Sequence, residues 1–125
     1  MDKKRILIID DEENFSSLVK KNIEQTGEFE VETASNGEDG IRLAKMKKPD
    51  LILLDILMPD MDGGDVAARI KNDKNIKETP IVFLTAIVRE EEVSSRSNTA
   101  SGHPFLAKTV TVGELIACIK KNLKK

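Results

Sequence analysis

Five short runs rich in apolar residues, separated by stretches with helical spacing, set the pattern of this chain. The runs cover residues 5–9, 29–34, 51–54, 80–84 and 105–107. Those at 5–9, 51–54 and 80–84 are almost continuously apolar, which is typical of strands buried on both faces of a parallel sheet. Residues 29–34 instead alternate apolar and polar positions, so we expect a half-exposed strand near an edge.

The stretches between these runs carry apolar residues at helical spacing. We expect helices between Glu13 and Gly27, over 38–47, from Val66 to about Asn72, and after Thr111. Strands and helices in alternation predict an α/β fold, with a doubly wound parallel sheet and helices on both faces. The segment 86–104 departs from the pattern because its Ser-rich part, 94–101, has low helix propensity. There we expect a short or loosely held fourth helix.

Length and composition fit one globular domain over residues 1–125. The chain has 39% hydrophobic and 34% charged residues and a formal net charge of −2, which does not favour bulk binding to nucleic acid or to a membrane surface. We find neither an apolar run of membrane-spanning length nor the apolar core of a signal peptide. Cys118 is the one cysteine, so no internal disulfide can form, and we expect a cytoplasmic location.

Side chains capable of chemistry follow four of the five predicted strands: Asp10 and Asp11, Asp55, Thr85, and Lys108. Because the carboxyl ends of parallel strands meet at one edge of the sheet, we expect these side chains to converge. Three carboxylates in one cleft repel each other, and Mg²⁺ suits a site that offers a few carboxylates. A metal, a lysine and a hydroxyl around a carboxylate describe a phosphoryl site in which the carboxylate attacks phosphorus.

These residues, with Met58, Pro59 and Gly63 after the third strand and Ala86 after the fourth, resemble the receiver domains of bacterial two-component response regulators, of the single-domain chemotaxis type. The resemblance spans nearly the whole chain and implies a flavodoxin-like fold with sheet order 2-1-3-4-5. It implies that Asp55 is the phosphoacceptor. It also implies that Asp10, Asp11, Asp55 and the backbone carbonyl of Leu57 hold Mg²⁺.

The same resemblance implies a switch. Thr85 would bind the phosphoryl group and move on activation, Lys108 would pair with that group, and Phe105 would be the switch aromatic. The domain would catalyse only its own phosphorylation and dephosphorylation. We expect a sensor histidine kinase or a phosphotransfer protein upstream. Downstream we expect a protein partner that reads the 86–107 surface, formed by the fourth helix, fifth strand and last helix, without direct contact to nucleic acid or membrane.

Two features depart from the family pattern. Thr109 stands directly after Lys108, where the family usually has proline, often with a cis bond. The Ser-rich stretch 94–101 replaces a helix that is usually Ala-rich. His103, the only histidine, is interpreted as a loop residue.

Three other functions stay open at this point. An aspartate-nucleophile phosphatase would share the carboxylate chemistry, but it expects a D-x-D arrangement after the first strand. A flavin or nucleotide binder needs a Gly- or Ser/Thr-rich loop there, and the acidic residues 10–13 would repel its phosphate. A degenerate receiver that only docks partners is disfavoured by the intact set of Asp10, Asp11, Asp55, Thr85 and Lys108.

Overall fold

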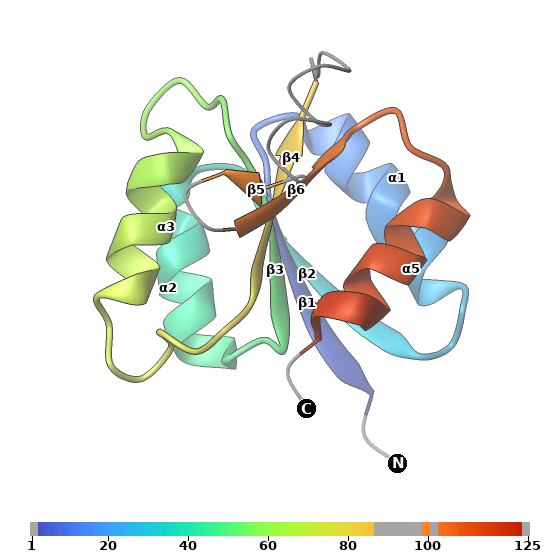
Figure 1. Ribbon diagram of the computed structural model, residues 1–125, viewed down its shortest axis with the longest axis horizontal. Coiled ribbons are helices and arrows are strands. Elements are labelled where there is room, and N and C mark those ends of the chain that lie inside the picture. Colours follow the sequence, from blue (N-terminus) through green and yellow to red (C-terminus); the bar gives the residue numbers. More distant parts are fainter. Residues whose placement is uncertain (1–2, 87–98, 101–102, 124–125) are drawn as a thin grey trace.

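A central sheet with helices packed on both faces forms the architecture that the computed structural model describes for residues 3–86, 99–100 and 103–123. Figure 1 shows α2 (Gly37–Lys47) and α3 (Gly63–Lys71) on one face, and α1 (Glu13–Glu24) and α5 (Val112–Asn122) on the other. The predicted doubly wound α/β fold is therefore confirmed.

Six strands make up the described sheet, in the order β2-β1-β3-β4-β6-β5. They are β1 (Lys4–Ile9), β2 (Phe29–Ala34), β3 (Leu51–Asp55), β4 (Ile81–Thr85), β5 (Thr99–Ala100) and β6 (His103–Ala107). The first five strands in this order form four parallel pairs, so β6 takes the fifth place and the predicted order 2-1-3-4-5 is confirmed.

The sheet edge beyond β6 differs from the prediction. The two-residue strand β5 pairs antiparallel with β6, with Thr99 opposite Pro104 and Ala100 opposite His103. The expected fourth helix therefore does not continue through these two residues, and the part of it over 87–98 lies outside the described residues. His103 belongs to β6 rather than to a loop, and its ring packs edge-on against Phe83, with 5.6 Å between ring centroids.

Alternation along the central strands divides the core into two layers. On β1, Leu7 and Ile9 belong to the cluster under α2 and α3, whereas Ile6 and Ile8 belong to the cluster under α1 and α5. All five residues of β3 are buried, as the continuous apolar run predicts. Strand β2 buries Phe29, Val31 and Ala34, exposes its other three residues and lies at the sheet edge, which confirms the expectation of a half-exposed edge strand.

Side-chain caps begin three of the four described helices. Asn36, Asp62 and Thr111 each accept a hydrogen bond from the backbone amide three residues on, and Thr111 with Glu114 forms the predicted capping box. The fourth helix of this set, α1, has Glu12 at its N-cap, and the Glu12 side chain makes no capping hydrogen bond.

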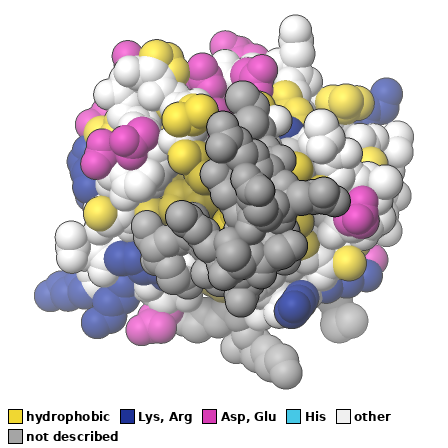
Figure 2. All heavy atoms as spheres, turned by 45° about the horizontal axis from the view of Figure 1, so that its top comes forward, with side chains coloured by type: hydrophobic (Ala, Val, Ile, Leu, Met, Phe, Trp, Pro, Cys, Tyr) yellow, Lys and Arg dark blue, Asp and Glu magenta, His cyan; other side chains and the backbone are white. Residues whose placement is uncertain are grey.

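The parallel strands end at the edge of the sheet that lies at the top of Figure 1, away from both chain termini. Figure 2 turns this edge forward and shows several acidic side chains gathered near the upper rim of the face, with apolar side chains below them. Among the described residues, the helices are too short or too polar to cross a membrane.

Candidate functional site at the carboxyl edge of the sheet

Three carboxylates converge where β1 and β3 end. Asp10 and Asp11 directly follow β1, Asp55 is the last residue of β3, and one carboxylate oxygen from each lies within 4.8 Å of the others. The side chains of Asp10 and Asp55 are buried, with 0% and 6% of their surface exposed, whereas Asp11 is exposed. The sequence predicted this convergence, since parallel strands bring these positions to one edge.

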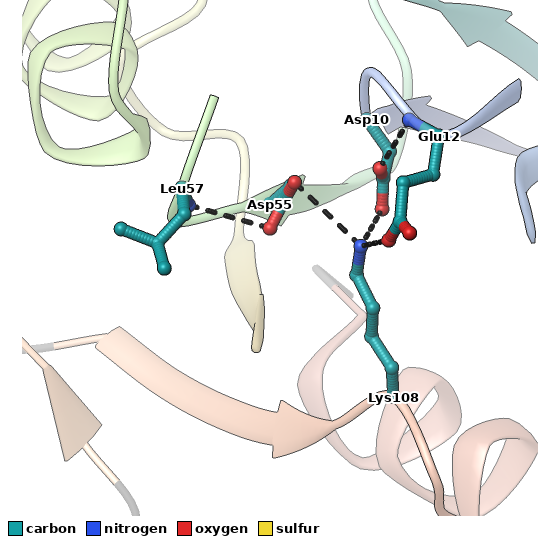
Figure 3. Close-up of polar contacts among 5 residues, drawn as sticks. All are labelled: Asp10, Glu12, Asp55, Leu57 and Lys108. Atoms are coloured by element: carbon teal, nitrogen blue, oxygen red, sulfur yellow. Dashed lines mark hydrogen bonds and ion pairs between the residues drawn. The ribbon is translucent and has the colours of Figure 1, made fainter. Parts of the chain in front are cut away.

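Lys108 reaches the carboxylates from the opposite side, just beyond the end of β6. Its Nζ lies 2.8 Å from Asp10 Oδ2 and 3.6 Å from Asp55 Oδ2, and only 9% of the side chain is exposed (Figure 3). Nζ also stands 4.7 Å from the centroid of the Phe15 ring, which adds a cation–π contact. The ammonium group is therefore held in a largely dry site beside the acidic cluster.

The environment of Asp55 favours its protonated form. Burial is the largest cause and the nearby charge of Asp10 is the second, and together they raise the pKa of Asp55 from 3.8 to about 7. The Lys108 ammonium and the hydrogen bond from the Leu57 amide act in the other direction but are outweighed. Burial alone would lower the pKa of Lys108, yet the carboxylates of Asp10, Glu12 and Asp55 raise it, so the amine stays charged.

The donor set of this cluster fits a divalent cation. Asp10 Oδ2 is buried and faces the Lys108 ammonium group, with 2.8 Å between Oδ2 and Nζ. Three carboxylates supply more negative charge than one ammonium group can neutralise, and hard oxygen ligands are those that Mg²⁺ prefers. The residues therefore fit a magnesium ion.

The loop after β3 is built around a close backbone approach. The Ile56 amide continues the pairing with β4 by donating to the Leu84 carbonyl at 3.0 Å, and the Gly63 amide donates back to the Ile56 carbonyl at 2.7 Å. The Leu57 amide donates to Asp55 Oδ1 at 3.3 Å, while the Leu57 side chain is 68% exposed and points away from the carboxylate (Figure 3). These contacts orient one Asp55 oxygen and leave Oδ2 facing Lys108.

Thr85 and Phe105, the predicted switch residues, lie on adjacent strands β4 and β6. Thr85 is half-buried at the end of β4, and its carbonyl accepts a 2.8 Å hydrogen bond from the Lys108 amide. Phe105 is half-buried opposite Phe83 and packs against the core cluster under α2 and α3. A displacement of the end of β4 would thus act directly on the backbone of Lys108.

The sequence interpretation missed one side chain in this site. Glu12 Oε1 lies 2.5 Å from Lys108 Nζ, closer than either Asp10 or Asp55. The sequence signal for Glu12 was its position directly after Asp10 and Asp11. The parallel topology brings this position, like the acidic pair, toward the end of β6. Thr109 stands where the family usually has proline, and the peptide bond between Lys108 and Thr109 is trans, as are the other peptide bonds of the described residues.

Comparison with known families gives one match over almost the whole chain. The family model described as the response regulator receiver domain matches residues 6–120. Transcriptional regulatory protein PhoP of Bacillus subtilis, which is named for alkaline phosphatase synthesis, is 35% identical over 123 residues, covering 98% of this chain and 49% of PhoP. The DNA-binding regulator RpaA of Synechocystis is 34% identical over 121 residues, covering 97% of this chain and 49% of RpaA. The chain thus spans about half the length of these curated relatives.

Solved structures give the same fold. A putative response regulator of Chloroflexus aurantiacus superposes with a TM-score of 0.82 at 26% identity, covering 96% of this chain and 97% of the other. A CheY-like receiver domain of Methanospirillum hungatei superposes with a TM-score of 0.79 at 27% identity, with 96% and 93% coverage. Chemotaxis protein CheY4 of Vibrio cholerae reaches 0.84 at 24% identity, with 98% and 100% coverage, which speaks for the fold alone.

Proposed function

This chain belongs to the response regulator receiver domains of two-component signalling, and on that premise we propose that it is switched by phosphorylation of Asp55. The observation that carries the proposal is the position of Asp55, buried at the end of β3 with Oδ2 facing Lys108 and with Asp10 and Asp11 beside it. A carboxylate nucleophile beside a cation, with further carboxylates that can hold a metal ion, is an arrangement suited to phosphoryl transfer onto an aspartate.

In the proposed reaction, an Asp55 oxygen attacks the phosphorus of a phosphohistidine on a sensor kinase or phosphotransfer protein. The new O–P bond forms as the N–P bond to histidine breaks, and the histidine nitrogen keeps the electron pair. Lys108 neutralises charge on the phosphoryl oxygens, and the Thr85 hydroxyl donates a hydrogen bond to one of them. The phosphoryl group would later leave when water hydrolyses the acyl phosphate to Asp55 and free phosphate, so the domain would catalyse only its own phosphorylation and dephosphorylation.

We propose that Asp10, Asp11, Asp55 and the backbone carbonyl of Leu57 hold Mg²⁺. The bound ion supplies positive charge that stabilises the phosphoryl oxygens as charge builds on them. The protein residues perform the remaining work. Asp10 and Asp11 would give the site enough negative charge to retain the cation. The positive charges of Lys108 and of the bound cation would favour the deprotonated Asp55 that the attack needs, against the burial that raises its pKa to about 7.

The proposed output is a rearrangement of the 86–107 surface. Thr85 would move toward the phosphoryl group and draw the start of the following segment with it, while Phe105 would rotate to fill the vacated space. The hydrogen bond between the Lys108 amide and the Thr85 carbonyl would carry the same movement to the end of β6. A protein partner would then read the surface made by the segment after β4, by β6 and by α5.

We further propose that residues 1–125 work as one receiver unit in the cytoplasm. With a net charge of −2, this unit would pass its signal by protein contact rather than by touching nucleic acid or a membrane. PhoP and RpaA are named as transcriptional regulators, and the chain matches about half of each, so their DNA-directed activity is not carried over to these residues.

Acetyl phosphate with and without Mg²⁺ tests this function. Intact-mass spectrometry should show one phosphoryl group added only when both are present. Hydroxylamine should remove that group, because it cleaves acyl phosphates and leaves phosphate esters of serine or threonine intact. Phosphorylation that resists hydroxylamine, or that does not occur with both reagents, would reject the proposal.

A further inference from the structure

The Lys108 ammonium group is held closer to the end of β1 than to the proposed acceptor. Its distances are 2.5 Å to Glu12 Oε1 and 2.8 Å to Asp10 Oδ2, against 3.6 Å to Asp55 Oδ2. Figure 3 shows the carboxylates of Asp10 and Glu12 on one side of the amine and the Asp55 carboxylate on its other side. Lys108 Nζ is therefore held nearer to Glu12 and Asp10 than to Asp55, the proposed phosphoacceptor.

The local structure of Glu12 leaves its carboxylate available for this contact. It occupies the N-cap of α1, yet its carboxylate caps nothing, whereas Asn36, Asp62 and Thr111 cap their own helices. Its backbone is fixed by a 2.8 Å hydrogen bond from the Glu12 amide to Asp10 Oδ1. The Glu12 carboxylate thus makes no capping hydrogen bond to α1 and contacts Lys108.

The three partners of Lys108 differ in the free energy that it costs to break their ion pair with the ammonium group. Asp10 is fully buried and Asp55 almost so, and a buried carboxylate that loses its cation has no water to replace it. The Glu12 side chain is 61% exposed, so it can turn into solvent at small cost. Glu12 is the partner that Lys108 can exchange.

We propose that Glu12 is a positioning residue that retains Lys108 on the β1 side of the site and competes with the phosphoryl group for the ammonium group. This inference rests on the proposed function, because the competitor is a phosphoryl group at Asp55. Phosphorylation would then pull Lys108 off Glu12, and the glutamate would weaken the phosphorylated state until it is released. The balance between resting and active forms would be set partly by an exposed residue outside the metal site.

The test compares Glu12→Gln with Glu13→Gln in the full chain. Both variants lose one negative charge beside the acidic pair, but Glu13 is exposed and makes no ion pair with Lys108 within the described part of the chain. Beryllofluoride, a phosphoryl mimic, is titrated at saturating Mg²⁺ by calorimetry or ¹⁹F NMR, since the chain has no Trp or Tyr to report binding. Glu12→Gln should bind it roughly two- to fivefold more tightly than Glu13→Gln, the effect of a partly exposed ion pair.

Two further readouts separate competition from a general structural effect. In a Lys108→Met background, Glu12→Gln should no longer tighten beryllofluoride binding, because there is no ammonium group left to compete for. In the wild-type chain, the NMR signal of the Lys108 ε-methylene should shift on beryllofluoride binding, and Glu12→Gln should move the free-state signal toward the bound position.

The outcomes distinguish this inference from the function on which it rests. If the wild-type chain does not bind beryllofluoride with Mg²⁺, the phosphoryl site itself fails and the inference falls with it. If the wild-type chain binds but Glu12→Gln and Glu13→Gln have equal affinities, the function stands and the competition by Glu12 is rejected. A tightening by Glu12→Gln that persists in the Lys108→Met background would also reject it.

Discussion

Gly63 lies so close to Asp55 that a side chain at residue 63 has no room: a Cβ atom there would stand 2.5 Å from the Asp55 carbonyl oxygen. The Gly63 amide meanwhile donates to the Ile56 carbonyl at 2.7 Å, so α3 begins directly against the backbone of Asp55 and Ile56. This approach fixes the loop whose Leu57 amide orients the Asp55 carboxylate. Glycine at residue 63 is therefore a requirement of the site geometry.

Gly63→Ala should destabilise the fold, because the clash is with backbone atoms that cannot rotate away. We expect a loss of roughly 1–3 kcal/mol in the free energy of unfolding, measured by urea denaturation. Gly64→Ala is the matched control. Its Cβ would approach only the exposed Asp62 carboxylate, at 3.2 Å, and we expect a change within about 1 kcal/mol of zero. Equal effects of the two substitutions would contradict the proposed close packing.

Millimolar Mg²⁺ should raise the melting temperature of the wild-type chain, because an ion that binds only the folded state stabilises it by mass action. Asp11→Ala should lose most of this shift, while Asp60→Ala, which removes an exposed carboxylate from the loop after β3, should keep it. Calorimetric melting with and without the ion measures the difference. A melting temperature of the wild-type chain that is indifferent to Mg²⁺ would contradict the site.

The raised pKa of Asp55 predicts a pH-dependent stability in metal-free buffer. Since the folded state binds this proton with a pKa of about 7 and an ordinary carboxyl has 3.8, unfolding releases a proton between about pH 4 and pH 7. The contribution of Asp55 is therefore fully present below about pH 4 and is lost as the pH rises through 7. The stability of the wild-type chain relative to Asp55→Asn should fall across that window, at up to about 1.4 kcal/mol per pH unit. Parallel stability profiles of the two proteins would contradict the raised pKa.

The proposed switch predicts where the protection of backbone amides from hydrogen exchange should change. On addition of beryllofluoride and Mg²⁺, the largest change in hydrogen exchange away from Asp55 should fall within 86–107, including the amides of β6. Helix α2, which packs against β1 and β2 at the other end of the strand order from β6, should change little. A larger change over α2 than over β6 would place the output surface elsewhere.

Much of this site could be predicted from the sequence because it depends on topology. Continuous apolar runs predict buried parallel strands, and parallel strands bring Asp10, Asp55 and Lys108 to one edge whatever their side-chain rotamers. The strand β5 could not be predicted, since two residues of a Ser-rich stretch show no periodicity. The pairing of Glu12 with Lys108 could not be predicted from the sequence pattern either. It depends on the side-chain conformation of Glu12, which contacts a cation far away in the sequence and does not cap α1.

Chemical mapping of the phosphoryl group tests the central claim, that Asp55 is the acceptor. The chain is treated with acetyl phosphate and Mg²⁺ and then reduced with borohydride, which converts an aspartyl phosphate to homoserine. Peptide sequencing by mass spectrometry should find the reduced residue at position 55, and Asp55→Asn should show none there while Asp50→Asn behaves as wild type. Reduction at Asp10 or Asp11 in the wild-type chain, or an unchanged uptake of phosphate by Asp55→Asn, would contradict this account.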